Sequence, residues 1–160
     1  MKAINTFAYI IATWFKVGLW PVAPGTWGSL MAFPPAIVIY FLFGTKGLFI
    51  VTLIGFIIGT IATYFVLYTD VNPDPSYIVI DEVVGQWLVL CAAGSDIRFW
   101  VIGFIFFRVF DILKPYPIKL MERYFADGSD SSKAVGVMID DSVAAIYAIV
   151  CLFMLALIFE

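Results

Sequence analysis

Long uncharged apolar runs alternate with short polar segments along this chain, and the lengths of the runs predict membrane-crossing helices. Residues 48–68 form 21 uncharged residues in succession, and about 20 suffice for an α-helix to cross a bilayer. Residues 142–159 form a second run, of 18 residues. Counting the shorter runs, we expect about five spans, at residues 29–43, 48–68, 83–93, 99–113 and 142–159.

Residues 3–15 form an apolar run that is too short to cross a bilayer. Its apolar side chains recur at helical spacing on one side, which predicts a short helix lying in the membrane interface. A helix packed inside the bundle is the alternative for this run. Pro34 and Pro35 predict a kink in the first span, and residues 44–47 predict a tight turn after it. The fold class that follows is an all-α polytopic membrane bundle of about five spans plus a short N-terminal interfacial helix, in a single domain over residues 1–160.

Composition supports the bilayer and removes several kinds of chemistry. Hydrophobic residues make up 63% of the chain and charged residues 13%, against about 45–50% and about 25% in soluble domains. The net charge of −3 argues against a nucleic-acid partner. Histidine is absent, which excludes histidine nucleophiles, bases and metal ligands. Cys91 and Cys151 both lie in apolar runs, where packing is a better explanation than a disulfide.

The distribution of basic residues predicts the orientation of the bundle. With a cytoplasmic N-terminus, six basic residues are cytoplasmic, namely Lys2, Lys16, Lys114, Lys119, Arg123 and Lys133, and only Lys46 and Arg98 lie opposite. This asymmetry follows the positive-inside rule. Ten of the twelve acids fall on the same face, so we expect the chemistry at the cytoplasmic surface of the membrane.

Residues 21–29, with the sequence PVAPGTWGS, form a glycine-rich segment that leads into the first span. Glycines allow the backbone amides to approach a ligand, and the N-terminus of a helix suits a phosphate group. Thr26 and Ser29 could add hydroxyl donors. The alternative is an entry loop in which Ser29 caps the following helix.

Two pairs of adjacent acids are expected to open helices: Asp81 with Glu82, and Asp140 with Asp141. One acid at a helix start complements the helix dipole, but adjacent like charges repel each other unless a cation lies between them. Two such pairs on one membrane face could form an oxygen cage for magnesium.

Arg108, Asp111 and Lys114 are spaced by three residues and therefore share a helix face. Arg108 and Lys114 could bind phosphate oxygens, or the three could form an ion-pair ladder between helices. Ionisable residues inside a span are costly and indicate a functional site. Lys119, Arg123 and Lys133 are expected to meet anionic lipid headgroups.

Four motifs in this order resemble the phosphatidylglycerophosphatase A family: PVAPGTWGS at 21–29, IVIDEVVG at 78–85, FRVFDILKPYP at 107–117 and GVMIDDSVA at 136–144. One departure is Ala145, where the family usually has glycine. The resemblance implies magnesium-dependent removal of the terminal phosphate of phosphatidylglycerophosphate, giving phosphatidylglycerol, at the cytoplasmic face of the inner membrane. It also implies a phospholipid as the partner, while the sequence allows no protein partner to be inferred and leaves homo-oligomerisation open.

The resemblance also implies roles for individual residues. The catalytic set it implies is Asp81, Asp111, Asp140 and Asp141, and the Mg²⁺ ligands it implies are Asp81, Glu82, Asp140 and Asp141. The substrate phosphate would be bound by Thr26, Ser29, Arg108 and Lys114, beside a loop formed by Pro24, Gly25 and Gly28.

Two questions stay open at the level of the sequence. The attacking group is either a metal-activated water or an aspartate that forms an acyl phosphate, and the first is favoured because no known aspartyl-phosphate motif is present. The competing class of function is a small transporter or channel that uses intramembrane Asp and Arg residues. Its sites should lie near the middle of the membrane.

Overall fold

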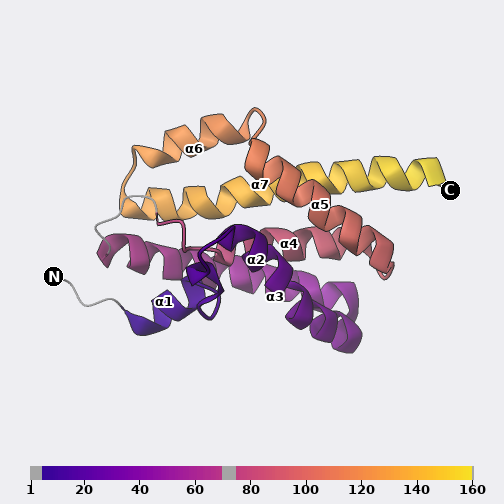
Figure 1. Ribbon diagram of the computed structural model, residues 1–160, viewed down its shortest axis with the longest axis horizontal. Helices are drawn as coiled ribbons and strands as arrows, with labels where there is room; N and C mark the ends of the chain where they lie inside the picture. The colour runs from indigo at the N-terminus through magenta and orange to yellow at the C-terminus, as the bar shows by residue number, and fades with distance from the viewer. Residues whose placement is uncertain (1–4, 70–74, 160) are drawn as a thin grey trace.

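The computed structural model describes residues 5–69 and 75–159, and every regular element within them is helical. The elements run along the chain as α1 (Thr6–Ala12), η1 (Val17–Leu19), α2 (Pro24–Met31), α3 (Phe33–Thr69), α4 (Ile80–Ala93), α5 (Ile97–Leu113), α6 (Ile118–Ala126) and α7 (Asp130–Phe159) (Figure 1). The expected all-α class is confirmed.

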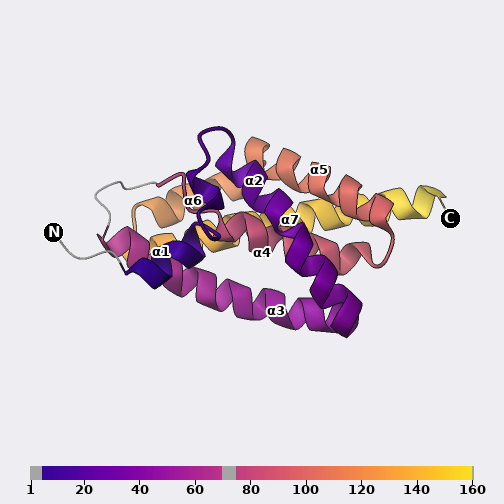
Figure 2. The ribbon, with the colours of Figure 1, turned by 60° about the horizontal axis from the view of Figure 1, so that its bottom comes forward.

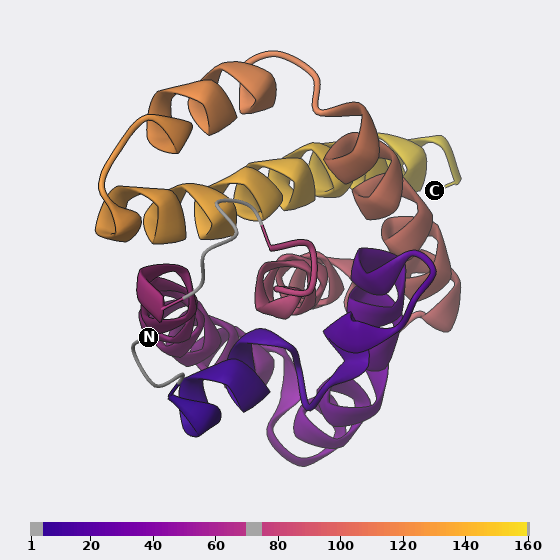
Figure 3. The ribbon, with the colours of Figure 1, turned by 60° about the vertical axis from the view of Figure 1, so that its left-hand side comes forward.

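Helix α4 forms the centre of the bundle, and α2, α3, α5 and α7 all pack against it (Figure 3). Nine of its fourteen residues are buried, including Gln86. A helix that is apolar around most of its circumference is stable only when other helices surround it. Helix α6 instead lies outside this group, against α7.

The chain becomes helical earlier than residue 29, where the first span was expected to begin. Helix α2 begins at Pro24, and proline is well suited to a first helical position because its missing N–H would be unpaired there anyway. Pro34 and Pro35 lie in the first turn of α3 for the same reason. They mark a helix start rather than the predicted kink within a span.

The predicted turn at 44–47 is reduced to one residue. Gly44 has φ 65° and ψ −168°, and the residues on either side of it are helical. Figure 2 shows α2 and the first part of α3 descending to this point, after which the chain runs back beneath the bundle. A positive φ is accessible to glycine at little cost, so Gly44 reverses the chain without a loop.

The last helix also begins earlier than expected, at Asp130. Asp140 and Asp141 therefore lie about three turns inside α7, and the expectation that they open the last span is wrong. Ala134 and Met138, one turn apart, are both buried and anchor the first turns of α7 to the bundle. The helix dipole cannot account for acids so far from the helix start.

Within residues 5–69 and 75–159, two helical stretches are long and apolar enough to cross a membrane, Pro24–Thr69 and Asp130–Ile158. The five expected spans are not confirmed by this measure. The outward surfaces of α3, α5 and α7 nevertheless carry many exposed large apolar side chains, which indicates association with a membrane. Helix α1 packs against α3 with Ala8 and Ala12 buried, as expected if it belongs to the bundle.

Candidate active site

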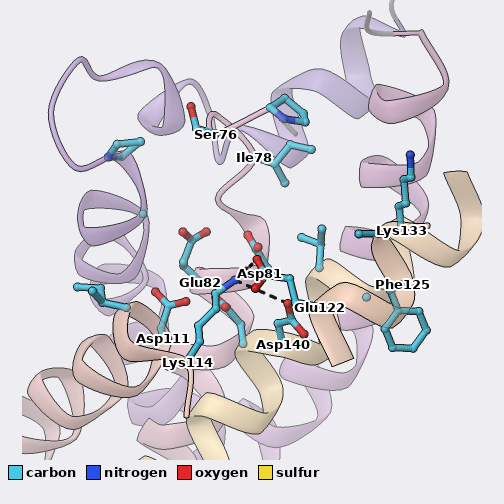
Figure 4. A pocket seen from close by; sticks show the side chains of 18 of the residues that line it. Ser76, Ile78, Asp81, Glu82, Asp111, Lys114, Glu122, Phe125, Lys133 and Asp140 are labelled. Atoms are coloured by element: carbon cyan, nitrogen blue, oxygen red, sulfur yellow. Dashed lines mark hydrogen bonds and ion pairs between the residues drawn. The ribbon is translucent and has the colours of Figure 1, made fainter. Parts of the chain in front are cut away.

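A cavity of about 660 Å³ opens at one end of the bundle, between the start of α2, the start of α4, the end of α5, α6 and the first half of α7 (Figure 4). Its lining includes six acids and three bases: Asp81, Glu82, Asp111, Glu122, Asp140, Asp141, Arg108, Lys114 and Lys133. The structure thus brings most of the predicted charged residues into one place from four different helices.

Three of the acids form a cluster. Asp81 and Glu82 come from the first turn of α4 and Asp141 from α7, and carboxylate oxygens of all three lie within 4.8 Å of one another. Gly85 permits this approach, because a Cβ at this position would lie 3.1 Å from the backbone oxygen of Asp141 and would collide with the ring of Phe107.

The cluster fits a divalent cation. Each member has one buried oxygen that finds no hydrogen-bond partner among the described residues, namely Asp81 Oδ1, Glu82 Oε2 and Asp141 Oδ2. Unpaired buried carboxylate oxygens are costly, and a hard cation such as Mg²⁺ prefers oxygen ligands of this kind. Asp111 lies close enough to Asp141 to interact with it, which adds to the negative charge around the cluster.

Asp140 stands apart from this cluster. Its Oδ2 lies 3.7 Å from Lys114 Nζ, and Lys114 Nζ lies 2.9 Å from Glu122 Oε1. Consecutive residues of a helix point about 100° apart, and here Asp141 is directed toward Asp81 and Glu82 whereas Asp140 is directed toward Lys114. The predicted four-acid cage is therefore a three-acid cluster with Asp140 beside it, on the side of Lys114.

Lys114 remains a cation in this setting. Burial alone would lower its pKa, but the hydrogen bond to Glu122 and the charges of Glu122, Asp140 and Asp141 outweigh burial and raise the pKa above its ordinary value. Lys114 is the C-cap of α5 with φ 43°, and this left-handed conformation turns the chain away from the line of Arg108 and Asp111.

Arg108 is held by two neighbours. Its Nη1 lies 2.6 Å from Asp111 Oδ2 and donates a hydrogen bond to Ser29 Oγ at 3.3 Å. Ser29 in turn donates to the carbonyl oxygen of Gly25 at 3.0 Å. Ser29 is fully buried and does not line the cavity, so the structure places it behind Arg108 rather than in position to bind the substrate's phosphate.

The glycine-rich segment contributes its first residues to the cavity. Pro24, Gly25 and Thr26 line it, whereas Gly28 packs on Val79, with 2.9 Å between an added Cβ and Val79 Cβ. A Cβ on Gly25 would collide with Glu82 Oε1. Helix α2 thus begins directly beside the acid cluster, and a side chain at residue 25 would displace the end of the Glu82 side chain.

Comparison with known proteins identifies the family. The family model of phosphatidylglycerophosphatase A matches residues 10–156. The chain belongs to the phosphatidylglycerophosphatase A family. This phosphatase is 38% identical to phosphatidylglycerophosphatase A of Haemophilus influenzae, over 91% of its own length and 86% of the relative's. It is 34% identical to the Escherichia coli protein of that name, over 86% and 77% of the two chains.

A third relative carries a different name. A Bacteroides thetaiotaomicron protein, provisionally named a phosphatidylinositol-3-phosphatase, is 35% identical over 94% of each chain. No solved structure matches significantly. The family assigns this chain to the phosphoric monoester hydrolases, so it is an enzyme.

Sequence reasoning missed one acid of the phosphatase's site and one buried polar residue of α4. Glu122 was not singled out, because nothing in the polar segment 115–141 distinguishes it from a solvated acid. Gln86 is fully buried on α4, one turn after Glu82, and neither its Nε2 nor its Oε1 has a partner among the described residues. A glutamine in an otherwise apolar stretch of α4 was the available signal.

Proposed function

We propose that this phosphatase uses Mg²⁺ to hydrolyse the terminal phosphomonoester of phosphatidylglycerophosphate, giving phosphatidylglycerol for phospholipid biosynthesis. The observation that carries the proposal is the cavity in which Asp81, Glu82 and Asp141 gather beside Arg108 and Lys114. Two of the relatives carry the name of this activity.

Charge explains why a cation belongs in the reaction. A phosphomonoester carries a charge of about −1.5 to −2 near neutral pH, and the cavity lining holds six acids against three bases. An anionic headgroup would be repelled from such a cavity unless cations offset the carboxylates. Asp81, Glu82 and Asp141 would hold Mg²⁺, which when bound stabilises charge on phosphoryl oxygens and lowers the pKa of a bound water.

The basic residues would orient the phosphate. Arg108 is suited to this task because Asp111 and Ser29 hold its guanidinium group while its Nε has no partner among the described residues. An arginine fixed in one rotamer presents its planar donors to phosphate oxygens at a small entropic cost. Lys114 would add a point charge, exchanging its ion pair with Glu122 for the substrate.

The nucleophile that we favour is water. Asp140 is the candidate to orient it, because its Oδ1 is buried with no partner in the described part of the chain and it lies outside the three-acid cluster. A carboxylate that accepts a proton from water as the phosphorus–oxygen bond forms acts as a general base. The competing route, through an aspartyl phosphate, would make the same residue the nucleophile.

We further propose five spans, a cytoplasmic N-terminus and an active face toward the cytoplasm in the inner membrane. Support comes from the two long apolar helices, the exposed apolar surfaces of α3, α5 and α7, and the six-to-two distribution of basic residues. A transporter or channel would place its charges near the middle of the spans. Here they collect where α4 begins and α5 ends, which favours an enzyme of the membrane surface.

Phosphate release from defined lipids tests the proposed function. The purified chain in detergent micelles is offered phosphatidylglycerophosphate, phosphatidylinositol 3-phosphate or glycerol 3-phosphate, each with EDTA or with Mg²⁺ in excess. We expect release from phosphatidylglycerophosphate only with Mg²⁺, and little from the other two. Full activity in EDTA would remove the cation from the mechanism, and preference for phosphatidylinositol 3-phosphate would overturn the proposed substrate.

A further inference from the structure

Helix α6 has one face that packs against the bundle. Ile118 is fully buried, and Phe125 packs so closely on α7 that a Cβ at Gly136 would collide with Phe125 Cβ. Glu122, on the same side, forms the ion pair with Lys114. This inner face therefore forms one wall of the cavity, through Glu122, Phe125 and Ala126.

The outer face of α6 is apolar and aromatic although nothing in the bundle covers it. Leu120 and Tyr124 are four residues apart in α6 and are 55% and 77% exposed, so they form a line along one side of the helix. Tyr116, in the turn just before the helix, is 78% exposed. Tyr147 of α7 donates a hydrogen bond of 2.9 Å to the carbonyl oxygen of Tyr116. This bond ties the turn that leads into α6 to α7.

Two cations border this line. Lys119 and Arg123 are four residues apart, so they lie on one side of the helix, and both are exposed. Neither forms an ion pair within the part of the chain that the structure describes. The outer surface of α6, meaning Lys119, Leu120, Arg123 and Tyr124, thus combines aromatic and apolar side chains with two positive charges that have no ion-pair partner among the described residues.

We propose that the outer surface of α6 binds anionic phospholipid headgroups of the membrane. Tyrosines are enriched at the boundary between hydrocarbon and water, and unpaired Lys and Arg are attracted to anionic lipids there. A second copy of the chain is the poorer occupant, because a two-fold contact through this surface would bring Lys119 and Arg123 of both copies together. The inference rests on the membrane location proposed above.

The consequence concerns delivery of the substrate. The same helix presents its inner face to the cavity, so headgroups held on its outer surface lie about one helix diameter, roughly 10 Å, from the acids. The surface would concentrate anionic lipids next to the site before one of them enters it.

Fluorescence quenching in bilayers tests the contact without using phosphate release. The full chain without its two native cysteines carries a bimane fluorophore at Leu120→Cys, in nanodiscs that contain phosphatidylcholine and brominated phosphatidylserine. Ser131→Cys, at an exposed position in the first turn of α7, is the matched control. We expect bromolipid to quench the fluorophore at 120 and aqueous iodide to quench it at 131.

The two charges are tested in the same system. In the double variant Lys119→Gln, Arg123→Gln, the amount of brominated phosphatidylserine needed for half-quenching at residue 120 should rise several-fold, up to about 30-fold. Brominated phosphatidylcholine should quench both proteins equally. An unchanged half-quenching point would overturn the headgroup assignment.

Two other outcomes would overturn the contact with lipid itself. Quenching of residue 120 by iodide would place α6 in water, and protection from both quenchers would place a second protein copy on it. A chain that fails to release phosphate from any lipid still gives a result in this experiment, so its failure is distinguishable from failure of the proposed function.

Discussion

Replacing Asp141 with asparagine removes one negative charge from the three-acid cluster while keeping the shape of the side chain. Asp141 is almost fully buried, and its Oδ2 has no partner among the described residues. The substitution therefore creates no cavity and breaks no hydrogen bond to that oxygen. Its effects should follow from charge alone.

The geometry sets the size and sign of the effect on stability. At separations of up to 4.8 Å, two ionised carboxylates repel each other by roughly 3 kcal/mol at an effective dielectric constant of about 20. In EDTA the wild-type cluster bears this repulsion, so Asp141→Asn should unfold at an equal or higher temperature. A cation that binds only the folded state raises its stability, so Mg²⁺ should raise the Tm of the wild type more than that of the variant.

The effect on catalysis should have the opposite sign. Loss of one important electrostatic group typically lowers kcat by about 10²–10³, and we expect Asp141→Asn to fall in this range at saturating Mg²⁺. Asp140→Asn should also lower kcat, but should keep the rise in Tm with Mg²⁺ because Asp140 lies outside the cluster.

The assay combines phosphate release with thermal unfolding followed by tryptophan fluorescence, with and without Mg²⁺. Asp130→Asn is the matched control, because Asp130 lies in the first turn of α7 and does not line the cavity; it should be almost silent. The reasoning is refuted if Asp141→Asn keeps more than about a tenth of wild-type kcat, a loss below about 1.4 kcal/mol. An equal rise in Tm with Mg²⁺ in variant and wild type would also refute it.

Three further predictions follow from the same geometry. Arg108→Lys should lower kcat/KM by about 10²-fold, because an ammonium group cannot reproduce the two-pronged hydrogen bonding of a guanidinium group. Ser29→Ala should lower kcat/KM by about tenfold or less, because Asp111 still holds Arg108. Equal losses in the two variants would contradict this order. Gly25→Ala should lower kcat at least tenfold by displacing the Glu82 side chain. Its Tm should stay level or rise, because alanine favours the helix by about 1 kcal/mol. An unchanged kcat would show that the contact between residue 25 and Glu82 does not matter for catalysis. A cysteine at residue 131, in a chain lacking Cys91 and Cys151, should react with an impermeant thiol reagent only from the cytoplasmic side; labelling of intact cells would invert the proposed orientation.

Residue patterns alone were enough for the helical class, for most helix positions and for singling out most of the charged residues that the structure brings together, Glu122 excepted. Uncharged runs placed the second part of α3, α5 and the apolar half of α7, because helix formation by a long apolar segment depends on its own composition. Most of the charged residues of the site could be named because burying a charge in so apolar a chain costs free energy, so a charge there indicates a functional site. Acids as far apart in the chain as Asp81 and Asp141 were expected to lie close together at one face of the membrane, and in the structure these two do.

The roles of neighbouring residues depended on the packing of the helices. Asp140 and Asp141 are adjacent aspartates, so the sequence does not distinguish their roles. The direction in which each side chain points depends on how α7 is rotated against α4, and only Asp141 reaches the cluster. Ser29 pairs with Arg108 across 79 positions of sequence, and no local pattern encodes such a contact. Local composition reports what a segment can bury, whereas the neighbour that each polar atom meets is set by the rotation and depth of whole helices as they pack.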